Sequence, residues 1–111
     1  MSGPTPPSQG GKTGSTPVSR SEMHYLYILY LKNGMLYKGI TSDLKRRIRE
    51  HKSGKVKSTK FKRPLKLIYY ESYLTKSDAE RRERFLKTTE GKRLLRLQLR
   101  DVLRQLKLKT L

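Results

Sequence analysis

Arg47 and His51 are basic residues on the apolar side of a predicted helix, a position from which they could act on an anion. Leu44, Arg47, Ile48 and His51 follow one another at steps of three and four residues, and side chains at these steps share one helix face. Burial of an unpaired guanidinium is costly, so the pattern predicts a partner for Arg47. The alternative is that Arg47 extends along the edge of the apolar face and that His51 is a frayed terminal residue favoured by the helix dipole.

Glu83 takes a similar position on a later predicted helix. Ala79, Glu83 and Leu86 follow one another at steps of four and three residues, so the carboxylate faces inward where an apolar residue is expected. The alternative is an ordinary ion pair with Arg82 or Arg84. A single polar pocket would account for an inward arginine, histidine and glutamate from two separate helices.

The chain has seven tyrosines, beside two phenylalanines and no tryptophan. Tyr37 stands out because Lys38 and Gly39 follow it, and a glycine within a strand often marks the close approach of a ligand or of another backbone. The other tyrosines outside the candidate site are expected to pack in the core or along an edge strand, and these include Tyr25, Tyr30, Tyr69 and Tyr70.

The elements that must position these residues begin with a β-hairpin. Strands are predicted from His24 to Leu31 and from Met35 to Ile40, on either side of Asn33-Gly34. A helix follows from a cap among residues 41–43 to about residue 52, with Gly54 as its stop, and a third strand covers residues 65–70. A capping box over residues 77–80 opens a second helix to about residue 87, and a third helix follows Gly91. One apolar stripe runs along that third helix, formed by Leu95, Leu99, Val102, Leu103 and Leu106.

The predicted fold is therefore a compact α/β domain of the α+β type, a three-stranded antiparallel sheet flanked by helices in the order ββαβαα. Its 111 residues allow one core. Residues 1–22 hold four of the five prolines and are expected to form a disordered tail, which leaves residues 23–111 as the domain.

Charge and cysteine content narrow the class of function. Lys and Arg number 27 against nine Asp and Glu, a formal charge of +18 that points to a polyanionic partner, with nucleic acid the leading candidate. The absence of cysteine excludes a disulfide scaffold, a zinc knuckle and a thiol nucleophile, and it agrees with a reducing, cytoplasmic location, including association with the nucleoid. The longest apolar run, residues 25–31, is too short for a membrane span.

Five segments in this order resemble the GIY-YIG nuclease domain, in particular its small stand-alone bacterial members. The two tripeptides are Tyr25-Leu26-Tyr27 and Tyr37-Lys38-Gly39, and neither is a literal match. They are followed by ITSDLKRRIREH, which is similar to the family's Arg-x-x-x-His helix, and by RPLKLIYYE and ERFLK. The resemblance covers about residues 23–95. No asparagine stands at the downstream position where some members carry one.

The resemblance implies a metal-dependent endonuclease that hydrolyses phosphodiester bonds, with a role for each matching residue. Tyr27 and Tyr37 correspond to the two catalytic tyrosines, Arg47 to the arginine that stabilises the scissile phosphate, and His51 to its helical neighbour, a rival base or relay. Glu83 corresponds to the single carboxylate that holds Mg²⁺ or Mn²⁺, and one carboxylate suffices because Mg²⁺ keeps most of its waters. A nearby arginine, the metal and the positive domain are expected to lower the pKa of a tyrosine base.

DNA is the expected substrate, structured or single-stranded, in repair or recombination, with RNA still possible and the oligomeric state open. Phosphate contacts are expected from a basic run beside the site and from Lys38, although a solvated loop is the alternative. The members of the run are Lys52, Lys55, Lys57, Lys60, Lys62 and Arg63. The rival functions are a basic module that binds nucleic acid without cutting it and a domain that scaffolds other proteins on nucleic acid.

A shared site for Tyr27 and Tyr37 requires a particular hairpin. A two-residue Asn33-Gly34 turn would pair Tyr30 with Tyr37 and send the two candidates to opposite faces of the sheet. A three-residue loop with Gly34 left-handed instead pairs Leu29 with Tyr37. The shared site therefore predicts the longer loop, against the stronger local preference.

Overall fold

The computed structural model describes residues 22–109, so the tail predicted over residues 1–22 lies outside the described residues apart from Glu22. The strands are β1 (His24–Tyr30), β2 (Leu36–Thr41) and β3 (Lys66–Tyr73). The helices are α1 (Leu44–Lys52), α2 (Lys76–Leu86), α3 (Thr89–Gln98) and α4 (Arg100–Lys109). The predicted order ββαβαα is confirmed, and the last helical segment is divided at Leu99 into α3 and α4.

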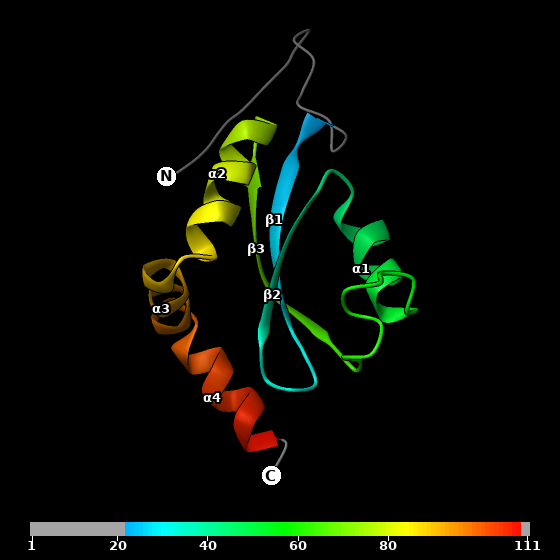
Figure 1. Cartoon of the computed structure of the whole chain (residues 1–111), viewed down its shortest axis with the longest axis vertical. Helices are drawn as coiled ribbons and strands as arrows, with labels where there is room; N and C mark the ends of the chain where they lie inside the picture. The colour runs from blue at the N-terminus through cyan, green and yellow to red at the C-terminus, as the bar shows by residue number, and fades with distance from the viewer. Residues whose placement is uncertain (1–21, 110–111) are drawn as a thin grey trace, which may run out of the picture.

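The three strands form an antiparallel sheet in the order β2-β1-β3, with α1 over one face and α2, α3 and α4 over the other (Figure 1). Alternate side chains of the central strand β1 serve two separate cores. Leu26 and Ile28 pack with Leu86, Leu95 and Leu99 of the helical layer. On the α1 face, Tyr27 and Leu29 form a second cluster with Leu31 and Leu65, against which Leu44 and Ile48 of α1 pack.

The hairpin between β1 and β2 has the longer loop that a shared tyrosine site requires. Leu29 pairs with Tyr37, and Tyr27 pairs with Gly39. Leu31 N donates to Met35 O at 3.0 Å, and Gly34 has φ of +84°, in the left-handed region that glycine adopts without strain. This prediction is confirmed, and Tyr27 and Tyr37 lie on the same face of the sheet.

Two helix starts differ from their predicted positions. The side chain of Thr75 caps α2 by accepting from Asp78 N, so Ser77 lies within the first turn of the helix. The side chain of Thr88 caps α3 by accepting from Gly91 N. Gly91 therefore lies inside α3, and its backbone packs so closely on the carbonyl of Phe85 that a Cβ would overlap it. By contrast, Asp43 is one of the predicted caps of α1.

The third strand is longer than predicted, because it continues to Tyr73 opposite His24. Tyr70, on this edge strand, is 52% exposed, whereas Tyr25, Tyr30 and Tyr69 are partly buried. Within residues 22–109, no helix combines the length and apolar character needed to cross a bilayer.

Candidate active site

A buried chain of hydrogen bonds links β1, α1 and the loop that follows α1. Tyr27 Oη lies 2.8 Å from His51 Nε2, and His51 Nδ1 lies 2.7 Å from Thr59 Oγ1. His51 and Thr59 are fully buried and Tyr27 is 1% exposed. His51 is therefore an interior residue rather than a frayed helix end. Thr59 was not singled out by the sequence, where it is one of the polar residues interleaved in a basic run.

Arg47 approaches the same hydroxyl from the other side. Its Nε donates to Tyr27 Oη at 3.4 Å and its Nη1 donates to Glu50 Oε1 at 3.0 Å. Since the Tyr27 oxygen accepts from Arg47, its single proton is left for His51 Nε2, and we assign the His51 proton to Nδ1, which donates to Thr59. The Arg47 side chain is 35% exposed, at the edge of the apolar face, so the guanidinium can reach a bound anion.

Tyr37 completes an aromatic cluster around His51. Its ring centroid lies 5.2 Å from that of His51 and 6.3 Å from that of Tyr27. Ser58 Oγ donates to Tyr37 Oη at 3.3 Å. The glycine that follows Lys38 marks the close approach of a side chain rather than of a ligand or another backbone, since a Cβ on Gly39 would overlap the phenol of Tyr27. Gly39 therefore allows Tyr27 to reach across β2.

Glu83 lies in a hollow of about 490 Å³ that Tyr37 and Lys38 also line. Its carboxylate pairs with Lys87 Nζ at 3.4 Å, not with Arg82 or Arg84. Arg82 pairs instead with Glu71, which also accepts from Tyr69 and Tyr73 and so ties α2 to β3. The structure thus brings Tyr27, Tyr37, Arg47 and His51 together, with Glu83 in an adjoining hollow.

The electrostatics of Tyr27 correct one expectation. Burial raises the pKa of Tyr27 above its usual value, and the hydrogen bond from Arg47 lowers it by less. The charge of Glu83 adds to the rise. The expected lowering by the positive surroundings is therefore wrong for the protein alone, because desolvation of a phenolate outweighs one guanidinium. Tyr27 is neutral at rest.

His51 is also neutral at pH 7. Burial, and then the positive charge of Arg47, lower the pKa of His51 to about 4, with Glu50 acting in the opposite sense. Between this value and the unfolded value of about 6.5, the unfolded chain binds the proton that the folded chain excludes. The free energy of unfolding should therefore fall as pH drops from about 6.5 to about 4.

We expect His51 to contribute at most about 3.5 kcal/mol to that acid destabilisation, at about 1.4 kcal/mol per pH unit. Urea unfolding of the wild type and of His51→Gln between pH 4.5 and 7.5 measures the contribution as the difference between the two pH slopes. His24→Gln is the matched control, since it removes the other histidine. Equal slopes for the wild type and His51→Gln would mean that His51 does not exclude the proton.

The basic loop lies beside this cluster, but its members differ. Arg63 donates to Lys60 O at 3.0 Å and to Lys52 O at 3.2 Å, so it braces the loop. Val56 and Thr59 anchor the loop in the interior. The remaining side chains of the predicted basic run are exposed, namely Lys52, Lys55, Lys57, Lys60 and Lys62.

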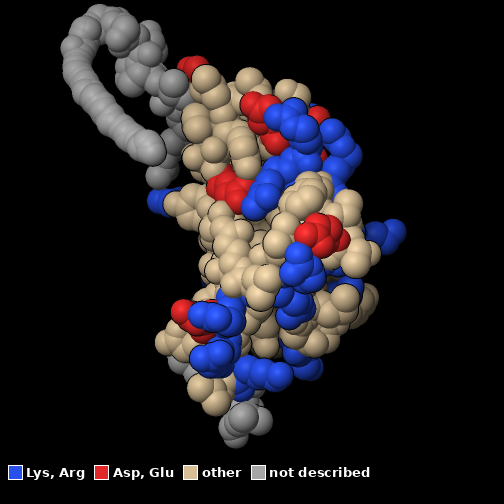
Figure 2. All heavy atoms as spheres, turned by 90° about the vertical axis from the view of Figure 1, so that its left-hand side faces the viewer, with Lys and Arg blue, Asp and Glu red and all other residues tan. Residues whose placement is uncertain are grey.

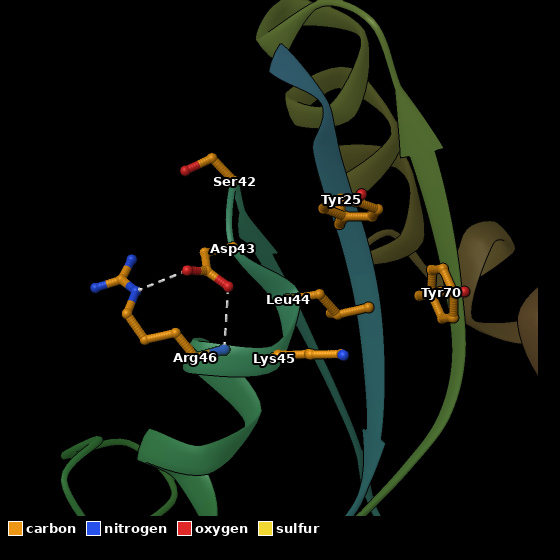
Figure 3. Close-up of a pocket in the computed structure, with 7 residues that line it drawn as sticks. All are labelled: Tyr25, Ser42, Asp43, Leu44, Lys45, Arg46 and Tyr70. Carbon is orange, nitrogen blue, oxygen red and sulfur yellow. Dashed lines mark hydrogen bonds and ion pairs between the residues drawn. The ribbon is translucent and has the colours of Figure 1, made fainter. Parts of the chain in front are cut away.

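A hollow of about 590 Å³ at the start of α1 holds none of the predicted catalytic residues (Figure 3). The rings of Tyr25 and Tyr70 meet edge to face there, with centroids 6.0 Å apart. Asp43 accepts from Arg46 N at 3.2 Å and pairs with the Arg46 guanidinium. These polar groups cap α1 and do not form an acid–base pair.

The candidate site offers few side chains that could bind a metal ion. Among residues 22–109 there is no group of three or more His, Asp and Glu side chains that could hold an ion by protein ligands alone. Glu83 is the carboxylate lining its hollow, where Lys38, Lys87, Lys92 and Arg96 surround it. One carboxylate suits Mg²⁺ only when water and a substrate phosphate supply the other oxygens.

The chain is similar to one family model and to several known proteins. The family model of the GIY-YIG catalytic domain matches residues 23–96. The UPF0213 protein SSP2268 of Staphylococcus saprophyticus is 42% identical over 77 residues, which cover 68% of this chain and 94% of that protein. The solution NMR structure of the UPF0213 protein BH0048 from Bacillus halodurans is 38% identical and covers 66% of this chain and 81% of that one, with a TM-score of 0.44. For the protein EF2693 from E. faecalis the identity is 33%, the coverage 69% and 88%, and the TM-score 0.46.

Proposed function

Because the chain belongs to the GIY-YIG catalytic domain family, we propose that it is an endonuclease that hydrolyses phosphodiester bonds in DNA with Mg²⁺ or Mn²⁺. The observation that carries the proposal is the buried Tyr27–His51 pair beside the Arg47 guanidinium. A module that only binds nucleic acid has no need of a buried acid–base pair next to a partly exposed cation. A hydrolase needs both within reach of one phosphate.

In the proposed reaction a water molecule attacks phosphorus and loses a proton, while the bond from phosphorus to the leaving sugar oxygen breaks and that oxygen takes a proton from solvent. Tyr27 Oη takes that proton while its own passes to His51 Nε2, whose Nδ1–H is held by Thr59. A resting phenolate is unfavourable because the pKa of Tyr27 is raised and that of His51 is about 4. The two transfers are therefore coupled, and Tyr27 is ionised at most transiently.

Arg47 offsets the negative charge that develops on the phosphoryl oxygens. Its pKa is raised, most by the hydrogen bond to Tyr27 and also by the bond to Glu50, so it stays charged. Tyr37 lines the hollow of Glu83 and contacts the rings of Tyr27 and His51, which suits it to orient a phosphate between them.

Glu83 is the residue proposed to hold the metal ion, which when bound would stabilise charge on the phosphate. Four cations line the same hollow: Lys38, Lys87, Lys92 and Arg96. Their repulsion disfavours a divalent cation until an anionic substrate arrives, so metal and DNA should bind together at this site.

The exposed lysines of the loop after α1 are proposed to contact phosphates. Replacing Lys55, Lys57 and Lys60 together with Ala should flatten the slope of log K against log salt by about two to three units, near 0.9 for each lost contact on duplex DNA. Fluorescence anisotropy at several salt concentrations measures the slope. If the slope is unchanged, the loop faces away from the nucleic acid.

The test of the function is cleavage of labelled single-stranded, duplex and branched DNA, with an RNA strand alongside. Products are expected with Mg²⁺ or Mn²⁺ and not with EDTA. Binding to every substrate without cutting any of them, in either metal, would favour the non-catalytic module and reject the nuclease.

A further inference from the structure

The hollow that contains Glu83 adjoins a second one along the helical layer. The second hollow, of about 430 Å³, lies between the hairpin tip and the last two helices. Its lining residues are Tyr30, Gly34, Arg96, Arg100, Leu103, Arg104 and Lys107. Arg96 lines both hollows, and its Nη2 donates to Gly34 O at 3.3 Å. We call the two hollows together the basic trough.

The trough is strongly positive. Seven cations line it, Lys38, Lys87, Lys92, Arg96, Arg100, Arg104 and Lys107, against one carboxylate, Glu83. Figure 2 looks onto the side that carries α2, α3 and α4, where Lys and Arg lie over both the upper and the lower part and are more mixed with Asp and Glu in the upper part. Burial, and then the charges of Lys92, Arg96 and Lys87, lower the pKa of Lys38. So many like charges repel one another unless an anion lies among them.

Three of these cations recur at a regular interval. Arg96, Arg100 and Arg104 are each four residues apart in the sequence: Arg96 lies on α3, and Arg100 and Arg104 lie about 6 Å apart along the axis of α4. All three are exposed. Exposed guanidiniums that follow one another from α3 to α4 along one hollow fit a polymer with repeated phosphates better than a compact anion.

We propose that the basic trough carries the sugar-phosphate backbone of the nucleic acid on one side of the scissile bond. This inference rests on the proposed function and gives the substrate strand a path, from Tyr37 and Glu83 past Arg96 to α4. The family match ends at Arg96, so Arg100, Arg104 and Lys107 extend the path beyond it. An acidic protein segment is the less favoured occupant, because the trough includes the hollow of Glu83, where the scissile phosphate is proposed to bind.

The test is DNA binding in EDTA by Arg100→Gln/Arg104→Gln, whose replaced side chains are exposed and outside the core. The slope of log K against log salt should fall by about 1.8 units on duplex DNA and about 1.4 on a single strand, for two lost phosphate contacts. The matched control is Arg81→Gln/Arg93→Gln, which removes the same charge from residues that do not line the trough. The control should keep the wild-type slope.

Two outcomes would overturn the proposed role of the trough. One is a wild-type salt slope for the Arg100/Arg104 variant. The other is an equal decrease of the slope in the control variant, which would show that the effect depends on net charge alone. Labelled polyglutamate is the second probe, and selective loss of its binding, with DNA binding intact, would assign the trough to an acidic protein segment. DNA binding is measured in EDTA and does not depend on cleavage. If the wild type fails to cut DNA, that result rejects the proposed function but does not change the result of the binding test.

Discussion

Replacing Glu83 with Gln should slow Mg²⁺-dependent cleavage on the order of a thousandfold, because a metal ion contributes several kcal/mol of charge stabilisation in such a reaction. The amide keeps the size of the side chain and removes the charge that would hold the ion. The fold should survive, since the substitution breaks only the partly exposed pair with Lys87, a type of contact worth about 1 kcal/mol or less. Single-turnover cleavage measures the rate.

Glu80→Gln is the matched control, one turn earlier on α2, and it should cut at close to the wild-type rate. DNA binding by Glu83→Gln in EDTA should be as tight as that of the wild type or tighter, because the basic trough loses its carboxylate. Wild-type cleavage by Glu83→Gln would show that the metal assignment is wrong.

The hairpin shows what sequence could predict. Local preference alone favours the two-residue Asn33-Gly34 turn, which would separate Tyr27 from Tyr37. The requirement for a common face selected the longer loop, and the register is the one observed. The local turn preference and the requirement for both tyrosines on one face conflict here, and only the second predicted the observed register.

The protonation state of Tyr27 could not be predicted in the same way. Sequence shows how many positive charges the domain carries but not how deeply one hydroxyl is buried. Tyr27 is 1% exposed, so desolvation decides the direction of its pKa. Thr59 was missed for a related reason, because its contact with His51 depends on how the loop after α1 folds back.

The basic trough was missed because its cations come from separate elements. Lys38 is on β2, Lys87 follows α2, and Arg100 is on α4. Periodicity showed the apolar stripe of the last predicted helix, but it could not show that the arginines of this segment continue the hollow of Glu83. The basic loop was easier to predict because its lysines lie within a few residues of one another in the sequence, whereas the cations of the trough are far apart in the sequence.

Tyr27→Phe should lower the single-turnover rate by about a hundredfold to ten thousandfold, the range for loss of a general base. The phenylalanine ring still packs over Gly39, so the substitution removes the proposed catalytic hydroxyl and keeps the packing of the ring. Loss of the hydroxyl also leaves His51 Nε2 without its buried partner, at about 1–3 kcal/mol of stability. Tyr25→Phe, two residues away on the same face of β1, should leave the rate unchanged.

A double variant decides whether Tyr27 and His51 act as one proton relay. If they do, Tyr27→Phe/His51→Gln should be about as slow as the slower single variant, because either change already breaks the path of the proton. If the two residues contributed independently, the rate reductions of the two single variants would multiply in the double variant, and that result would reject the relay.

The pH dependence of the wild-type cleavage rate tests the same pair. On the acid side the rate should begin to fall near pH 4 rather than near pH 6.5, because the pKa of His51 is about 4 and protonated His51 cannot accept the proton of Tyr27. An acid limb near the ordinary histidine value would place the proton acceptor outside this buried pair.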